Sequence, residues 1–178
     1  ILKHLNKSQA TKLSNPGKKY VDGELFLYLG KEYRLQKAVS GKEFIRFNGE
    51  LIETGQEDLN DSVKTRKLIA GWYFLIARRE LAERMKNILQ TYRELKFAPS
   101  GLVIRQLKSR WGSCSSKGKI TLNSELVKLD PVLIDYVIIH ELCHLRHHNH
   151  GPDFHKLLGE IIPEYKSLRK ELRNFIIR

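Results

Sequence analysis

Alternating apolar and polar positions predict two β-hairpins in the first third of the chain. The expected strands are residues 26–29, 33–37, 44–47 and 51–54. The hairpin turns fall at Gly30-Lys31 and Asn48-Gly49, and an Asn-Gly pair between two such runs is a strong two-residue turn signal. We therefore expect the hairpins to form one small antiparallel sheet.

Apolar positions then recur at helical spacing from about residue 61 to residue 94, which predicts one long amphipathic helix. These positions are Leu68, Ile69, Trp72, Leu75, Ile76 and Leu81. We interpret the aromatic run Trp72, Tyr73 and Phe74 as core packing rather than ligand binding, because large aromatic side chains dominate cores. The helix is expected to pack on the second half of the chain.

Two further strands are predicted after the break at Pro99. Residues 102–107 and 119–122 are typical of strands, and the segment around Trp111 is expected to be a loop that joins them. Either strand is a candidate for an exposed sheet edge that pairs with an extended peptide.

A buried helix is predicted next, because Asp130 and Pro131 are typical of a helix start and precede the apolar run 132–139. Further helices are expected at residues 152–161 and 164–174, on either side of Pro163. The order of elements indicates an α+β fold. We divide the 178 residues into an N-terminal arm with hairpins, residues 1–60, and a helical core, residues 61–178, together forming one compact domain.

The composition bears on the cellular location of the protein. A Lys-rich lead-in reaches to about Lys19, no apolar stretch approaches the roughly 20 residues of a membrane span, and no secretory signal is evident. The cysteines Cys114 and Cys143 do not form a disulfide framework, and we interpret them as small packing residues. We therefore expect a cytoplasmic protein without a membrane partner.

The net charge of +12 attracts anionic partners such as nucleotides or nucleic acid. The basic residues are spread along the chain, and no run of them forms a nucleic-acid module. Solvated helix faces are the simpler interpretation of these charges, and nucleic acid is kept as an alternative partner.

The candidate metal-binding and catalytic residues lie in residues 140–144. His140 and His144 are one helical turn apart, and Glu141 lies beside them. Two imidazoles at this spacing can bind one zinc ion from the same helix face. A carboxylate next to them can take a proton from a water molecule whose pKa the zinc lowers. The segment therefore predicts a zinc hydrolase with Glu141 as its general base.

A catalytic zinc site needs a third protein ligand, and His150 is our first choice. It lies six residues after His144, and Gly151-Pro152 allow the chain to leave the helix and return His150 to the metal. The competing third ligands are His147, His148, His155, Glu160 and Glu164. Asp135 and Asp153 are near enough in sequence to accept a hydrogen bond from a ligand imidazole.

Several motifs resemble the YgjP-like metallopeptidase family. They are residues 110–116 (RWGSCSS), 118–123 (GKITLN), 136–144 (YVIIHELCH), Asn149-His150 and Phe154. The family is similar in its zinc core to the SprT-like and Wss1-like (WLM) peptidases. The resemblance implies a minimal, gluzincin-like zincin core whose HExxH helix packs on a small sheet, preceded by hairpins and a long helix. It implies one zinc ion on His140, His144 and His150, and His155 stands where many relatives have Trp.

A peptide or protein is the substrate that this resemblance implies, and Arg110, Trp111 and Asn123 are the candidate substrate-binding residues. For Arg110 and Trp111 a structural ion pair and a core anchor are equally good interpretations. The same zinc chemistry also fits a nucleoside triphosphate pyrophosphatase, for example on UTP, although no phosphate-binding glycine loop is visible. A non-catalytic zinc-containing binding module is the second alternative.

Overall fold

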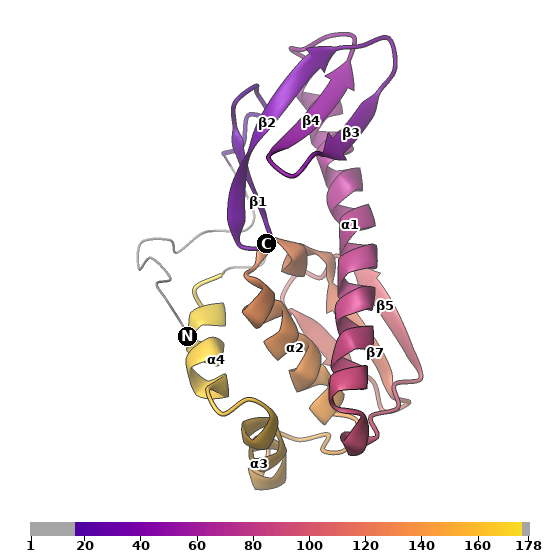
Figure 1. The fold of residues 1–178 in the computed structure, drawn as a ribbon, viewed down its shortest axis with the longest axis vertical. Helices are drawn as coiled ribbons and strands as arrows, with labels where there is room; N and C mark the ends of the chain where they lie inside the picture. The colour runs from indigo at the N-terminus through magenta and orange to yellow at the C-terminus, as the bar shows by residue number, and fades with distance from the viewer. Residues whose placement is uncertain (1–16, 176–178) are drawn as a thin grey trace.

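The computed structural model describes residues 17–175, and within them it shows two small sheets joined by one long helix (Figure 1). Most of the predicted Lys-rich lead-in lies outside these residues. The strands are β1 (Leu25–Tyr28), β2 (Lys31–Val39), β3 (Phe44–Phe47), β4 (Leu51–Gln56), β5 (Gly101–Arg105), β6 (Gly112–Cys114) and β7 (Lys119–Asn123). The helices are α1 (Ser62–Thr91), α2 (Pro131–Cys143), α3 (Pro152–Ile161) and α4 (Tyr165–Leu172), with 3-10 turns η1 (Arg93–Leu95) and η2 (Ser124–Lys128).

The first sheet contains both predicted hairpins, but it is mixed rather than antiparallel. Its strand order is β1-β2-β4-β3, and β2 and β4 pair in parallel. The chain passes from β2 to the outer strand β3 and returns in β4 between the two. The more buried strand thereby takes the inner place, since Ile52 and Thr54 of β4 are fully buried whereas no residue of β3 is.

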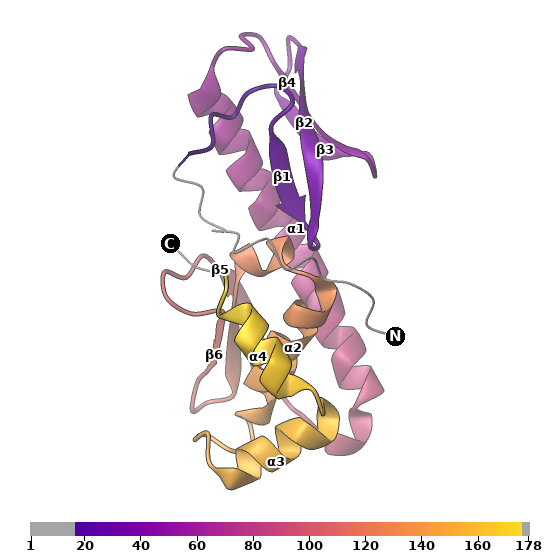
Figure 2. The same ribbon diagram turned by 90° about the vertical axis from the view of Figure 1, so that its left-hand side faces the viewer.

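Helix α1 confirms the predicted long helix and carries both halves of the molecule (Figures 1 and 2). Asp61 caps its start by accepting a hydrogen bond from the amide of Lys64. Near the first sheet, the Trp72 ring lies 5.6 Å from the Tyr28 ring. The prediction that Phe74 belongs to the core was wrong, because this side chain is 41% exposed on the solvent face of the helix. Leu75, one of the apolar positions that predicted the helix, is 64% exposed.

The second sheet has the order β5-β7-β6, with β5 and β7 parallel and β6 antiparallel to β7. Residues 112–114 form β6, whereas a loop is predicted there from the sequence. The prediction that residues 119–123 could be an edge strand was wrong, because β5 and β6 pair with the two sides of β7 and make it central. The free edges of this sheet are therefore β5 and β6, and β6 lies against α2.

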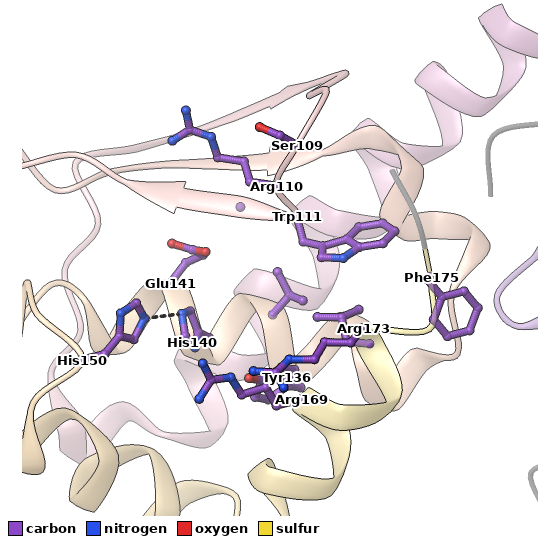
Figure 3. Close-up of a pocket in the computed structure, with 13 residues that line it drawn as sticks. Ser109, Arg110, Trp111, Tyr136, His140, Glu141, His150, Arg169, Arg173 and Phe175 are labelled. Atoms are coloured by element: carbon purple, nitrogen blue, oxygen red, sulfur yellow. Dashed lines mark hydrogen bonds between the residues drawn. The ribbon is translucent and has the colours of Figure 1, made fainter. Parts of the chain in front are cut away.

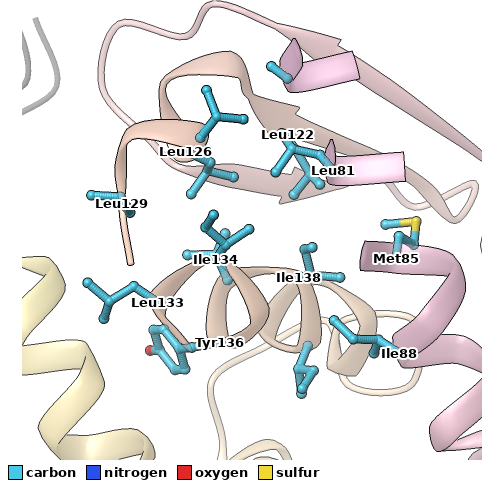
Figure 4. Packing of buried hydrophobic residues seen from close by; sticks show 14 of the residues in the cluster. Leu81, Met85, Ile88, Leu122, Leu126, Leu129, Leu133, Ile134, Tyr136 and Ile138 are labelled. Carbon is cyan, nitrogen blue, oxygen red and sulfur yellow. The ribbon is translucent and has the colours of Figure 1, made fainter. Parts of the chain in front are cut away.

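Helix α2 is the most deeply buried helix of the described chain, and it begins as predicted. Asp130 accepts a hydrogen bond from the amide of Val132, and Pro131 occupies the first turn. Its apolar residues pack between the second sheet and α1 (Figure 4). The β1–β2 turn packs closely against the start of α2. Gly30 has a φ of +76°, and a Cβ atom at this position would lie 2.9 Å from the Asp130 backbone, so the close approach requires glycine. This contact and the apolar packing hold α2 rigidly at the centre of the fold.

Candidate active site

Three histidines meet at the C-terminal end of α2. His140 lies in the last turn of that helix and His144 is its C-cap residue, whereas His150 comes from the loop that leads into α3. One ligand nitrogen from each ring lies within 4.8 Å of the other two, and the Nε2 atoms of His140 and His150 are 3.0 Å apart. Nitrogen ligands on one tetrahedral zinc ion are about 3.3 Å apart, given bond lengths near 2.0–2.1 Å. The cluster therefore fits a single zinc ion.

The path of the chain after α2 explains how His150 arrives there. The amide of His147 bonds the carbonyl of Cys143, which turns the chain at the helix end. Gly151 in extended conformation and Pro152 at the first helical position then start α3 in a new direction. Within residues 17–175, the competing third ligands from the sequence do not join the cluster.

Phe154 forms the floor beneath the three imidazoles. Its side chain is fully buried, and its ring centroid lies 5.0, 4.6 and 4.7 Å from those of His140, His144 and His150. Such packing restricts the rotation of each imidazole ring. The first turn of α3 therefore fixes the geometry of the candidate ligands.

Burial favours the neutral, metal-binding form of His140. Burial, with the neighbouring His144 and His150, lowers the pKa of His140 to about 3. Nδ1 of His144 is 3.0 Å from the carbonyl oxygen of His147, which favours a proton on Nδ1 and leaves Nε2 free for a metal. The carboxylates suggested from sequence do not take this role, since Asp135 pairs with Arg84 at 2.9 Å and Asp153 is exposed.

Glu141 is held at the inner wall of the site. Its side chain is 5% exposed, and its Oε2 atom is buried without a hydrogen-bond partner. Burial raises the pKa of Glu141 to about 7, and the charge of Arg110 opposes this rise. Gly112 of β6 makes room for it, because a Cβ atom there would lie 2.7 Å from Cγ and Oε1 of Glu141. An unpartnered carboxyl group with a pKa near neutrality suits a proton-transfer role.

A cavity of about 460 Å³ opens beside the histidines and Glu141 (Figure 3). Arg110 and Trp111, two of the candidate substrate-binding residues, line it. Asn123 does not reach it: this side chain is fully buried and donates hydrogen bonds to the carbonyls of Leu107 and Arg110. The amide of Asn123 therefore supports the loop that carries Arg110.

Several residues that line the cavity were not predicted from the sequence to belong to the site. Tyr136 lies one turn before His140 on α2, and Arg169 and Arg173 extend from α4 (Figure 3). The spacing of Tyr136 from His140 was a usable signal, because residues four apart share a helix face. No short-range sequence signal indicated that α4 would pack against α2.

A zincin-type metal site on a buried helix, facing a small sheet, defines a metal-dependent hydrolase. The chain belongs to the YgjP-like family, because the model of the YgjP-like metallopeptidase domain matches residues 1–175. The family confirms the resemblance drawn from the motifs and makes the protein a metallopeptidase-type enzyme.

Solved structures give a partial likeness. The zymogen of jannalysin, a metallopeptidase of Methanocaldococcus jannaschii, is 27% identical with a TM-score of 0.44, over 52% of this chain and 92% of that chain. The zymogen of abylysin, a metallopeptidase of Pyrococcus abyssi, is 27% identical with a TM-score of 0.42, over 53% of this chain and 90% of that chain. A comparison with curated proteins found no match. Among residues 17–175, no helix has both the length and the apolar character needed to cross a membrane.

Proposed function

We propose that this protein is a zinc-dependent peptidase that hydrolyses peptide bonds with Glu141 as the general base. His140, His144 and His150 hold the metal ion in this proposal. The observation that carries it is the convergence of three imidazoles with a buried carboxyl group that has no hydrogen-bond partner at Oε2. Family membership makes a peptide the expected substrate.

The chain's own groups have separate roles in the reaction. A bound zinc ion supplies Lewis-acid polarisation of the scissile carbonyl group and makes a water molecule more acidic. Glu141 accepts the proton of the attacking water and then donates it to the leaving amine. Burial raises its pKa to about 7, so proton transfer in either direction is favourable near neutral pH. Phe154 prevents the imidazoles from turning during these steps.

Strand β6 is the edge on which we place the substrate main chain. It pairs with β7 on one side, and its Gly112 contacts Glu141 and lines the cavity. An extended peptide that adds to this edge as a further strand brings its carbonyl groups past Glu141. Arg110 and Trp111 precede β6 and would orient the substrate at one end of the edge.

The test is a paired assay of the wild-type protein and Glu141→Gln, each with its zinc content measured. An unfolded protein and short peptides are offered in parallel with nucleoside triphosphates, with and without DNA. We expect the wild type to cleave peptide bonds, and we expect Glu141→Gln to keep one zinc ion and lose at least 100-fold in rate.

The same assay separates the alternatives raised from the sequence. Glu141-dependent release of pyrophosphate without proteolysis would identify a nucleotide hydrolase. A tightly held zinc ion without either activity would identify a binding module. Proteolysis that Glu141→Gln leaves intact would show that another group is the base.

A further inference from the structure

Helix α4 brings two arginines into the catalytic cavity. Arg169 and Arg173 are one helical turn apart, and both line the cavity that contains His140, Glu141 and His150 (Figure 3). Arg110 enters the same cavity from the opposite wall.

Among residues 17–175, the ion pairs do not include Arg110, Arg169 or Arg173. Glu141 is the one carboxylate among the residues that line the cavity. A bound divalent metal ion adds further positive charge. Like charges gathered in this way repel one another, and an anionic group brought by the ligand relieves the repulsion.

The basic surface continues beyond the cavity on the other side of α4. Arg169 and Arg173 also line a second cavity of about 520 Å³, together with Lys166, Lys170 and His155. The His155 ring stacks on the ring of Tyr165 there, with centroids 5.8 Å apart. The two arginines therefore stand between the catalytic cavity and a second basic hollow, where a ligand leaving the metal centre meets more positive charge.

We propose that Arg169 and Arg173 make this enzyme selective for peptides that place a carboxylate beside the scissile bond. The proposal rests on the proposed peptidase function, since a carboxylate is the anion that an unmodified peptide carries. Guanidinium groups bind carboxylates through paired, charge-assisted hydrogen bonds. The carboxylate is either an acidic side chain or the C-terminus of the peptide, and both fit the same two arginines.

The experiment compares four peptides of one sequence. They carry Glu or Gln next to the cleaved bond, and a free or amidated C-terminus. We expect kcat/KM to be about ten-fold higher for a peptide with the recognised carboxylate, and we expect the ratio to shrink as salt is added. The Glu/Gln ratio reports a side chain, and the acid/amide ratio reports a C-terminus. Ratios near one in both comparisons would overturn the proposal.

Variants assign the preference to α4. Arg169→Gln/Arg173→Gln should bring the ratio close to one, and Arg169→Glu/Arg173→Glu should reverse it in favour of a peptide with Lys at that position. The matched control is Arg78→Gln, an exposed arginine of α1 outside the cavity, which should leave the ratio as in the wild type. A preference that survives charge reversal would overturn the role of Arg169 and Arg173.

A binding measurement keeps this test independent of turnover. Zinc-loaded Glu141→Gln is titrated with the same labelled peptides, and fluorescence anisotropy gives the ratio of their dissociation constants. Absence of cleavage by the wild type would reject the proposed peptidase function, whereas the binding ratio would still test the carboxylate preference. Tighter binding of pyrophosphate than of any carboxylate peptide, lost in Arg169→Gln/Arg173→Gln, would overturn the assignment to a carboxylate.

Discussion

Gly112→Ala is the substitution that most directly tests the contact between β6 and the general base. The added Cβ atom would lie 2.7 Å from Cγ, 2.7 Å from Oε1 and 2.9 Å from Cδ of Glu141, whereas ordinary contacts begin near 3.4 Å. Glu141 is 5% exposed, so its side chain cannot move aside without entering the cavity. General acid–base catalysis contributes a rate enhancement of roughly 10²–10⁴-fold, and a displaced general base loses most of it. We therefore expect kcat to fall at least about 100-fold.

The assay measures kcat and KM on a fluorogenic peptide, with zinc content determined on the same sample. Gly112→Ala should keep its zinc, because the substitution touches none of the three histidines directly. Gly101→Ala on β5 is the control, since its new Cβ atom meets only Cε of Lys119 at 4.0 Å. In the Glu141→Gln background, Gly112→Ala should cause little further loss, because its effect acts through residue 141. A Gly112→Ala enzyme with more than about a third of the wild-type kcat would refute the reasoning.

Three further predictions follow from the site. Metal-free Glu141→Gln should be more stable than metal-free wild type at pH 8 but not at pH 5. The unfolded carboxyl group ionises near pH 4.5 and the buried one near 7, so wild-type stability is lost as pH rises between these values, by about 3 kcal/mol at most. Thermal melts at both pH values check this, and equal differences would contradict it. Phe154→Ala should lower stability by about 3–5 kcal/mol and weaken zinc binding, measured by denaturant titration and chelator competition; unchanged zinc affinity would exclude its role as the floor of the site. Asn123→Ala should release the loop of Arg110 and raise KM several-fold, and a KM equal to that of wild type would show that the loop holds without it.

The local elements of this fold could be predicted because their signals are contained in short segments. The Asn48-Gly49 turn, the Asp130 cap and the helical period of α1 each depend on residues within a few turns of one another. The spacing of His140, His144 and His150 belongs to the same class, and the structure brings these three together. Sequence was a sufficient guide wherever the interacting residues were neighbours in the chain.

Long-range pairing could not be predicted in the same way. The parallel pairing of β2 with β4 joins strands of two different predicted hairpins and buries Ile52 fully, and the turn signals of the hairpins do not indicate it. The contact of Gly112 with Glu141 joins positions far apart in sequence, and a lone glycine before a Ser-Cys pair gives no sign of it. Arg169 and Arg173 looked like a solvated helix face, because their opposite wall is formed by a distant loop.

The length of α1 has a consequence for how the molecule folds. At 1.5 Å per residue its 30 residues extend about 45 Å, and its two ends serve different sheets. Thr65, Ile69 and Trp72 are buried towards the hairpins, whereas Leu81, Met85 and Ile88 pack in the core around α2 (Figure 4). Each sheet therefore buries part of its apolar face against one end of the same helix. Loss of the hairpins would expose the apolar side chains at one end of α1 and weaken the packing that supports the metal-binding helix. We therefore expect the two halves to unfold in a single cooperative transition.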